Sequence, residues 1–320
     1  MKPRYRSYPD GTVAALIERY VAEMNGTFSG KPIRMLGASH LYTLRRLQRM
    51  PIGAMQADKL SKHDVIEHCK TRRLTVSAAT INQDVTYLSG VLKYASAAWA
   101  ECDKISAKAI TKSRTFLLQN GYVGKSTPRT RTPTDEEIER LLAYFEQPPK
   151  KLTACNICRM PDIIAFALVS ARRIGEICRI THADVDWEHK DEHGNAAPIY
   201  WVRDMKHPTK KKGNDKAFTL WPELAEIIRR QPRKEGDDRI FPFNDKSVGA
   251  KYTRAKNALG IEGLRFHDNR REAITAWLKR MPPHAVRKYV SGHDTSAIFD
   301  RVYDATKAED GHAALRQAPA

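Results

Sequence analysis

Apolar residues in the first third of the chain recur at the spacing of an amphipathic α-helix. The stretch 13–24 has a period near 3.6 residues, and the stretch 41–47 repeats it before a proline stops the pattern. A third stretch opens at Ser61 with the pattern of a capping box, and 81–92 carries apolar residues at spacings of four, three and four. Four such helices predict a small helical bundle over residues 1–123.

The composition changes at residues 124–133. This stretch has two prolines, three basic residues and no large apolar side chain, which is typical of an exposed linker that could cross a DNA backbone. Directly after it, Thr134 and Glu137 have the spacing of another capping box and precede a new helical pattern. We therefore expect a second domain over residues 134–320.

The second domain combines helical and strand-like patterns. Residues 161–180 are predicted to be helical, while the apolar and aromatic stretches 199–202 and 217–220 predict short strands. The polar segment 203–216 between them predicts a long β-hairpin with a basic tip, and helical patterns resume at Pro222. The expected fold class is mostly α with a small β-sheet: a helical N-terminal bundle followed by an α+β domain.

Charge adds a partner to this picture. The chain has a formal charge of +18 and a pI near 9.7, a surplus that attracts nucleic acid, although a basic but otherwise ordinary enzyme would share it. On the bundle, Arg45, Arg46 and Arg49 are candidate DNA contacts, although a solvated charged face would look the same. There is no apolar run of about 18 residues and no signal-peptide pattern, so we expect a cytoplasmic protein without a membrane partner.

The cysteines give no sign of a disulfide framework or a metal. There are five, an odd and scattered set that suits a reducing compartment. Cys155 and Cys158 form a C-x-x-C, but no second pair follows to complete a tetrahedral zinc site. A dense Asp/Glu cluster for a two-metal site is not evident either. We expect no metal site.

Arginines and histidines of the second domain suit the binding of a phosphate. His267 and Arg270 are three residues apart at the expected start of a helix, where they share a face and where an anion is favoured. Arg173 and Arg270 could grip the two non-bridging oxygens of one phosphate. His267 and His293 could hydrogen-bond it or shuttle protons near neutrality. Taken singly, each has an ordinary interpretation as a surface or helix-terminal residue.

Two more residues would complete a site for phosphoryl transfer. Lys206 on the hairpin can donate a proton to a leaving oxygen, and Tyr303 can attack phosphorus with its hydroxyl. Tyr289 is the competing nucleophile, but it precedes His293 and is expected in a packed helix. Cationic side chains would stabilise the charge, so this chemistry needs neither a metal nor another cofactor.

The order of these segments resembles the tyrosine recombinases, also called the phage integrase family. Their pattern is an Arg in an R-x-x-E box, a Lys on a β-hairpin, an H-x-x-R box, a G-H box and then a Tyr. The resemblance covers about residues 133–310 and, more loosely, the helical bundle. The matching residues are Arg173 with its supporting Glu176, Lys206, His267, Arg270, His293 and, ten residues later, Tyr303.

Two departures from the pattern bear on the assignments. The first box opens with Ser170 and Ala171 instead of Thr-Gly, and Arg172 stands beside Arg173, which the position of Glu176 favours as the catalytic member. The hairpin also holds several further lysines. Lys206 is preferred as the proton donor because it follows the first strand. The others are Lys210 and Lys212, which we expect to contact DNA, and Lys211 and Lys216.

The resemblance implies a function. The bundle would be a core-type DNA-binding domain that closes with the catalytic domain around duplex DNA. Tyr303 would form a 3′-phosphotyrosyl link and release a 5′-hydroxyl, and a hydroxyl from a partner strand would rejoin it. The expected protein is a site-specific recombinase for integration or excision of a phage or other mobile element. It would act as a homotetramer on two double-stranded DNA sites, with accessory DNA-bending factors as further possible partners. The alternatives are a type IB topoisomerase-like enzyme and a catalytically silent DNA-binding protein of the same fold.

Overall fold

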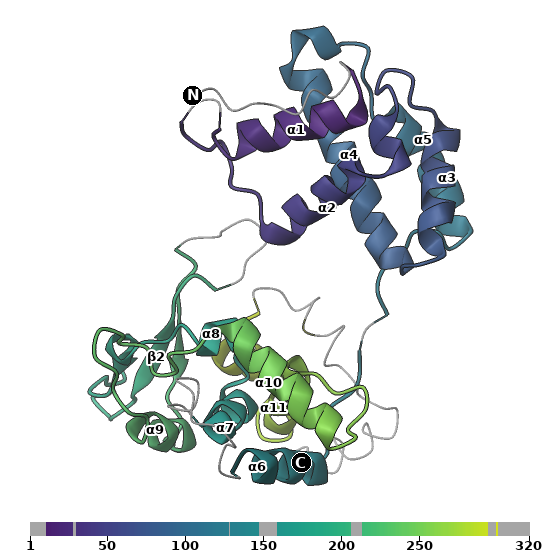
Figure 1. Ribbon diagram of the computed structural model, residues 1–320. Coiled ribbons are helices and arrows are strands. Elements are labelled where there is room, and N and C mark those ends of the chain that lie inside the picture. The colour runs from purple at the N-terminus through teal and green to yellow at the C-terminus, as the bar shows by residue number, and fades with distance from the viewer. Residues whose placement is uncertain are drawn as a thin grey trace, which may run out of the picture. The chain divides into compact units, whose positions relative to one another are not determined.

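The chain forms two compact units, one ending at Thr127 and the other beginning at Pro128. The computed structural model describes residues 11–27, 30–127, 129–146, 159–205, 213–293 and 299. Figure 1 colours the first unit purple to blue and the second teal to yellow. Helices dominate both units and a small sheet lies in the second, so the predicted fold class is confirmed.

The first unit is a helical bundle. Side chains cap three of its four predicted helices: Thr12 accepts a hydrogen bond from the Ala15 amide, Ser77 accepts one from the Thr80 amide, and Ser61 and Asp64 form the predicted reciprocal capping box. The apolar faces share one core, in which Leu88 and Leu92 are buried. The helices of this unit in Figure 1 are α1 (Val13–Met24), α2 (Ala38–Gln48), α3 (Lys62–Arg73), α4 (Ala78–Ala98) and α5 (Lys108–Gln119).

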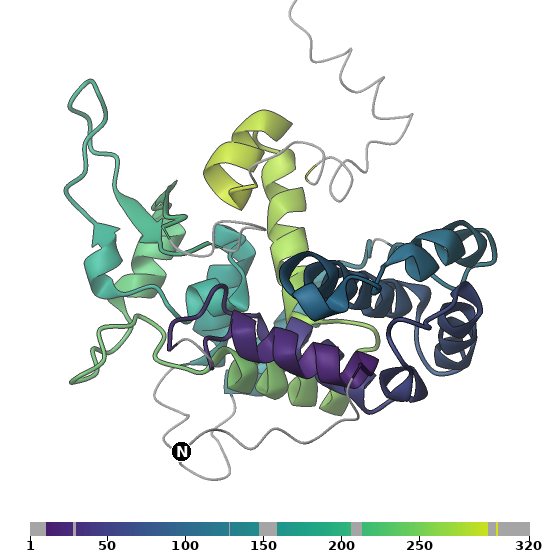
Figure 2. The same ribbon diagram turned by 90° about the horizontal axis from the view of Figure 1, so that it is seen from above.

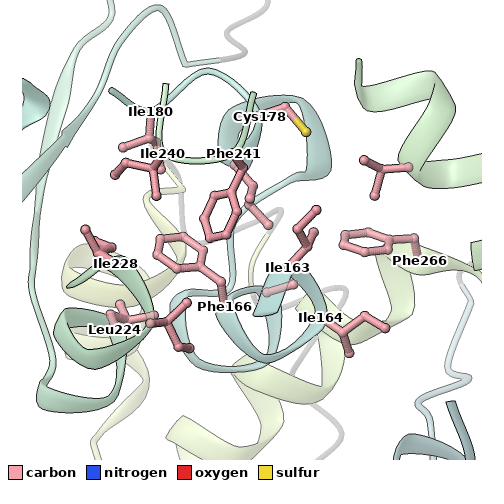
Figure 3. Packing of buried hydrophobic residues seen from close by; sticks show 14 of the residues in the cluster. Ile163, Ile164, Phe166, Cys178, Ile180, Leu224, Ile228, Ile240, Phe241 and Phe266 are labelled. Carbon is pink, nitrogen blue, oxygen red and sulfur yellow. The ribbon is translucent and has the colours of Figure 1, made fainter. Parts of the chain in front are cut away.

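The second unit is built around one apolar helix, α7 (Met160–Ser170). Its residues Ile163, Ile164 and Phe166 are fully buried, and the Phe166 ring meets that of Phe241 edge-on with 5.3 Å between centroids (Figure 3). Because α7 is covered by apolar side chains on several sides, it is a rigid base for the turn that follows it. The helices that pack on it are α6 (Asp135–Glu146), α9 (Pro222–Arg229) and α11 (Phe266–Leu278).

A three-stranded antiparallel sheet lies beside these helices, in the order β1 (Val185–Asp186), β2 (Ile199–Val202) and β3 (Lys216–Thr219). In the register of β2 and β3, Tyr200 is opposite Phe218 and Val202 is opposite Lys216. The predicted pair of strands is confirmed, with the second shifted by one residue. Residues 206–212 at the hairpin tip lie outside the described residues.

The predicted helical region 161–180 is broken in the middle. α7 ends at Ala171, whose φ of 54° is left-handed, and the short α8 (Ile174–Ile177) follows. This turn makes Arg173 the N-cap residue of α8, with extended backbone. The chain therefore changes direction in the segment that holds the two adjacent arginines.

The last described helices follow one another along the chain. After α10 (Asp245–Ala258) and α11 come α12 (Pro283–Ala285) and a π-helix, Val286–Ser291. The π-helix contacts α11, and Figure 2 shows the α12–π-helix segment in yellow at the end of α11. None of the helices in the described ranges is long and apolar enough to cross a membrane.

Candidate active site

Arg173 is held in place by a buried carboxylate. Glu176 is 2% exposed; its Oε1 accepts a hydrogen bond from Arg173 Nη1 at 2.7 Å, and its Oε2 accepts one from the Arg173 amide at 3.0 Å. Burial alone would raise the pKa of Glu176, but the charges of Arg172, Arg173 and Arg270 outweigh it and bring the pKa to about 2. The carboxylate therefore stays ionised and fixes a guanidinium whose side chain keeps 28% of its surface exposed.

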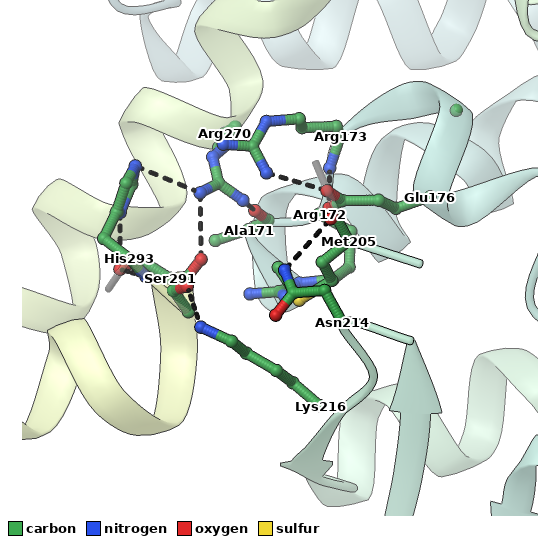
Figure 4. Close-up of polar contacts among 12 residues, drawn as sticks. Ala171, Arg172, Arg173, Glu176, Met205, Asn214, Lys216, Arg270, Ser291 and His293 are labelled. Atoms are coloured by element: carbon green, nitrogen blue, oxygen red, sulfur yellow. Dashed lines mark hydrogen bonds and ion pairs between the residues drawn. The ribbon is translucent and has the colours of Figure 1, made fainter. Parts of the chain in front are cut away.

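Arg270 is fixed by main-chain carbonyls instead. It lies on α11, 1% exposed, and its Nη1 donates to the carbonyl oxygen of Ala171 in the turn after α7. Its Nη2 donates to Ser291 O at 2.9 Å and lies 3.5 Å from His293 Nε2 (Figure 4). Arg270 thus joins three segments that are far apart in sequence.

His293 follows the π-helix through a glycine that no other residue could replace without a clash. Gly292 has a φ of 69°, and a Cβ there would lie 2.8 Å from Phe218 Cζ and 3.0 Å from Met205 Cε. His293 Nδ1 lies 2.8 Å from Ser291 Oγ. Burial, reinforced by the charges of Arg270 and Arg173, lowers the pKa of His293 to about 3. The ring is therefore neutral, and a proton on Nδ1 leaves Nε2 as an acceptor facing Arg270.

His267 lies one turn before Arg270 at the start of α11, as predicted. Asp268 sets this helix start, because its Oδ2 accepts a hydrogen bond from the Arg265 amide at 2.8 Å. The surrounding protein partly desolvates the imidazole ring and so lowers the pKa of His267. The positive charges of Arg270 and Arg173 lower it as well, and together these effects bring the pKa to about 4. The residue itself is exposed, so its neutral imidazole is accessible to a substrate.

The structure brings together the members of the predicted set that it describes. The positive charges of Arg173 and Arg270 lower the pKa of Glu176, of His293 and of His267. Figure 4 shows Arg173, Glu176, Arg270 and His293 around the turn at Ala171. The other predicted members, Lys206, Lys210, Lys212 and Tyr303, lie outside the described residues.

Tyr289 is the competing candidate nucleophile. It lies on the π-helix and is 46% exposed, with Lys288 Nζ 5.1 Å from the centre of its ring. The buried residues of this helix are Val286, Val290 and Ser291. The helix is packed, as expected, and the Tyr289 side chain lies on its exposed side.

Two cations of this region were not assigned a role from the sequence. Arg172 is completely buried, and its guanidinium lies 3.7 Å above the Phe218 ring. Lys216 donates from Nζ to Gly292 O at 2.9 Å. For Arg172, the sequence did hold a signal: it is a second arginine in the first box, and the family pattern needs one arginine there.

The three candidate DNA contacts of the bundle have different environments. Arg45 on α2 and Arg49, the C-cap residue of that helix, are exposed. Arg46, in contrast, forms an ion pair with Asp84, which is fully buried and also pairs with Arg72. Arg46 therefore has a role inside the bundle.

The thiols and acids add no metal site in the part of the chain that is described. Cys69, Cys102 and Cys178 are buried free thiols, and burial raises the pKa of Cys69 and Cys178 to about 12. No group of three His, Cys, Asp or Glu side chains in the described ranges is arranged to hold an ion. Cys155 and Cys158 lie outside the described residues.

Comparisons with known proteins agree with this geometry. A Haemophilus influenzae protein named as an integrase/recombinase is 26% identical over 324 residues, covering 97% of this chain and 77% of its own length. The Tn1549 transposon integrase, solved with circular intermediate DNA, has a TM-score of 0.69 at 16% identity over 97% of this chain and all of that chain. A lambda integrase tetramer on a Holliday junction has a TM-score of 0.65 at 14% identity over 93% of this chain and 80% of that one. The model of the phage integrase family matches residues 131–309, more than half of the sequence. The chain therefore belongs to the phage integrase family of tyrosine recombinases.

Proposed function

We propose that this chain integrates or excises a phage or other mobile element by cutting and rejoining DNA through Tyr303. The observation that carries the proposal is the grouping of Arg173 and Arg270 with two neutral histidines around one turn. Two guanidinium groups match the non-bridging oxygens of a phosphodiester. Neutral imidazoles beside them can accept or relay a proton.

In the proposed reaction, the Tyr303 oxygen attacks phosphorus and the bond to the 5′ oxygen breaks. The neutral His267 takes the phenol proton, and Lys206 gives a proton to the leaving 5′ oxygen. Arg173 and Arg270 stabilise the charge on the phosphate in the transition state, where fixed donors are most effective. The phosphotyrosyl bond keeps the energy of the phosphodiester, so rejoining needs no nucleotide cofactor.

The proposed partners are double-stranded DNA and further copies of the chain. The lambda integrase relative forms a tetramer on a Holliday junction, which supports a homotetramer on two sites. The first unit would bind DNA through Arg45 and Arg49, and the hairpin through Lys210 and Lys212. A DNA substrate also favours the expected cytoplasmic location.

The test is covalent trapping on a nicked cognate site, with and without EDTA. The wild type and Tyr289→Phe should form an adduct in both conditions, and peptide mapping should place it on Tyr303. Tyr303→Phe should bind the duplex with unchanged affinity and form no adduct. An adduct mapped to Tyr289, or one that needs a divalent metal, would contradict the proposal. Plasmid relaxation without strand exchange would instead favour a topoisomerase.

A further inference from the structure

The four successive carbonyl oxygens of residues 290–293 each accept a hydrogen bond from a cationic side chain. The donors come from different parts of the second unit. In chain order, the carbonyls of residues 290–293 are bound by Arg172, Arg270 (2.9 Å), Lys216 (2.9 Å) and Arg287 (3.2 Å). Of these donors, only Arg270 belongs to the proposed catalytic set.

The position of these carbonyls explains why cations bind there. The π-helix ends at Ser291, and the last carbonyls of a helix have no partner within it. They also lie at the negative end of the helix dipole, where a positive charge is favoured. The Gly292 amide donates to Arg287 O at 2.9 Å, and the four cationic donors add to this bond in fixing the direction of the main chain towards His293.

Arg172 is the donor whose burial is hardest to explain by stability alone. Its guanidinium is fully buried, and its Nε donates to Ser170 O at 3.0 Å. Among the described residues it bonds to carbonyl oxygens and stacks on Phe218, and no carboxylate forms an ion pair with it. A buried charge without an ion pair costs several kcal/mol. A residue with this cost is expected where the position of its guanidinium group serves the site.

Lys216 connects the same segment to the β-hairpin. It is the first residue of β3, and Phe218 two residues later forms part of the wall against which Gly292 is packed. The Nζ of Lys216 reaches Gly292 O, one residue before His293. The hairpin that carries Lys206 and the segment that carries His293 are therefore joined directly by this lysine.

We propose that Lys216, together with Arg172, is a positioning residue that fixes the main chain before His293, so that the imidazole stays beside Arg270. This inference rests on the proposed function. It assigns Lys216 a different role from Lys206: Lys216 holds the main chain and does not donate a proton to the leaving oxygen.

The test is single-turnover cleavage of a nicked site by Lys216→Met, with an ordinary 5′ oxygen and with a 5′ sulfur leaving group, which needs no proton. A misplacement of about 1 Å can lower a rate roughly 10²-fold. We expect Lys216→Met to cleave between about ten and a hundred times more slowly on both substrates. Duplex affinity should be unchanged. Lys216→Arg, which restores a donor, should recover most of the rate.

Lys279→Met is the matched control. It removes the same charge from an exposed position at the C-terminal end of α11, the end away from His267. It should cleave at the wild-type rate. Rescue of Lys216→Met by the 5′ sulfur would make Lys216 the proton donor and overturn the inference. So would a wild-type rate for Lys216→Met per folded molecule. If the wild type forms no covalent adduct at all, the proposed function fails instead.

Discussion

Each unit buries a cluster of charged groups, and the two clusters are balanced in different ways. In the first unit, the fully buried Asp84 forms ion pairs with Arg46 and with Arg72, the latter at 3.1 Å. In the second unit, Arg172 and Arg270 are just as deeply buried, yet the bonds described for them run to neutral carbonyl oxygens.

The difference separates a structural cluster from a site prepared for an anion. In the first cluster two arginines share one carboxylate, so two positive charges meet one negative charge. In the second cluster, three arginines act on Glu176, so among these described residues three positive charges meet one negative charge. Carbonyl oxygens orient a guanidinium without cancelling its charge, and the remaining positive field is available to a phosphate.

The largest effect is expected from removing either of the two arginines that we propose bind the phosphate. Arg173→Ala and Arg270→Ala should each lower the cleavage rate by roughly 10²–10³, because one preorganised donor to the transition state is lost. Duplex affinity should change little. Single-turnover cleavage and a binding titration on the same duplex check this. An equal loss of binding and cleavage would show that these residues only contact DNA.

Removing the compensating carboxylate of the first unit should affect folding instead. Asp84→Ala leaves Arg46 and Arg72 without their shared partner and should lower the free energy of unfolding by on the order of 3 kcal/mol. Denaturant unfolding measures the loss. Cleavage per folded molecule should stay at the wild-type level, and a selective loss of cleavage would contradict the distinction between the clusters.

The pH dependence sharpens the comparison through the histidines. The folded pKa values of His267 and His293, about 4 and about 3, are below the unfolded value of about 6.5. The unfolded chain therefore binds more protons between these values, and stability falls as the pH drops from about 6.5 towards 4. His293→Gln should make this decline shallower in urea unfolding at pH 7 and pH 5. An unchanged decline would mean that His293 is not buried in its neutral form.

The smallest effect concerns two neighbouring arginines of α2. Affinity for DNA should fall steeply with salt because the chain carries +18. Arg45→Ala should reduce the slope of log affinity against log salt by about one, as expected for a single phosphate contact. Arg46→Ala should change this slope less and destabilise the bundle more, because Arg46 is paired with Asp84. Equal slopes for the two variants would refute the assignment.

Periodicity and capping patterns were enough to predict most of the helices and both hairpin strands. α5 was not predicted. Its N-cap residue, Ala107, makes no side-chain hydrogen bond, and its buried positions include Ala109 and Ser113, which give a weak apolar pattern. The sequence placed Tyr289 in a packed helix but did not show on which side of that helix it lies. The turn is a π-helix, in which the wider turn changes the direction of each side chain.

The order of the motifs identified Arg173, His267, Arg270 and His293, and the structure groups them, but the roles of the surrounding cations depend on distant partners. Arg172 binds a carbonyl 118 residues away. Such contacts have no local signature in a sequence.

The linker illustrates the same limit of local patterns. Its basic composition suggested contact with DNA, yet Arg129 forms an ion pair with Asp268, 139 residues further along, and Arg131 with Glu137. Asp268 is 2% exposed and begins the helix that carries His267. A carboxylate that the fold brings near can therefore form an ion pair with a basic residue that composition alone assigns to DNA binding.

The most direct test of this arginine cluster is cleavage of a site whose scissile phosphate is replaced by a neutral methylphosphonate. If Arg173 and Arg270 act by neutralising phosphate charge, removing that charge should make them largely dispensable. The loss of roughly 10²–10³ expected for each alanine variant on the natural phosphate should then shrink to a few-fold. Losses of the same size on the neutral and the charged substrate would contradict the claim that Arg173 and Arg270 bind an anion.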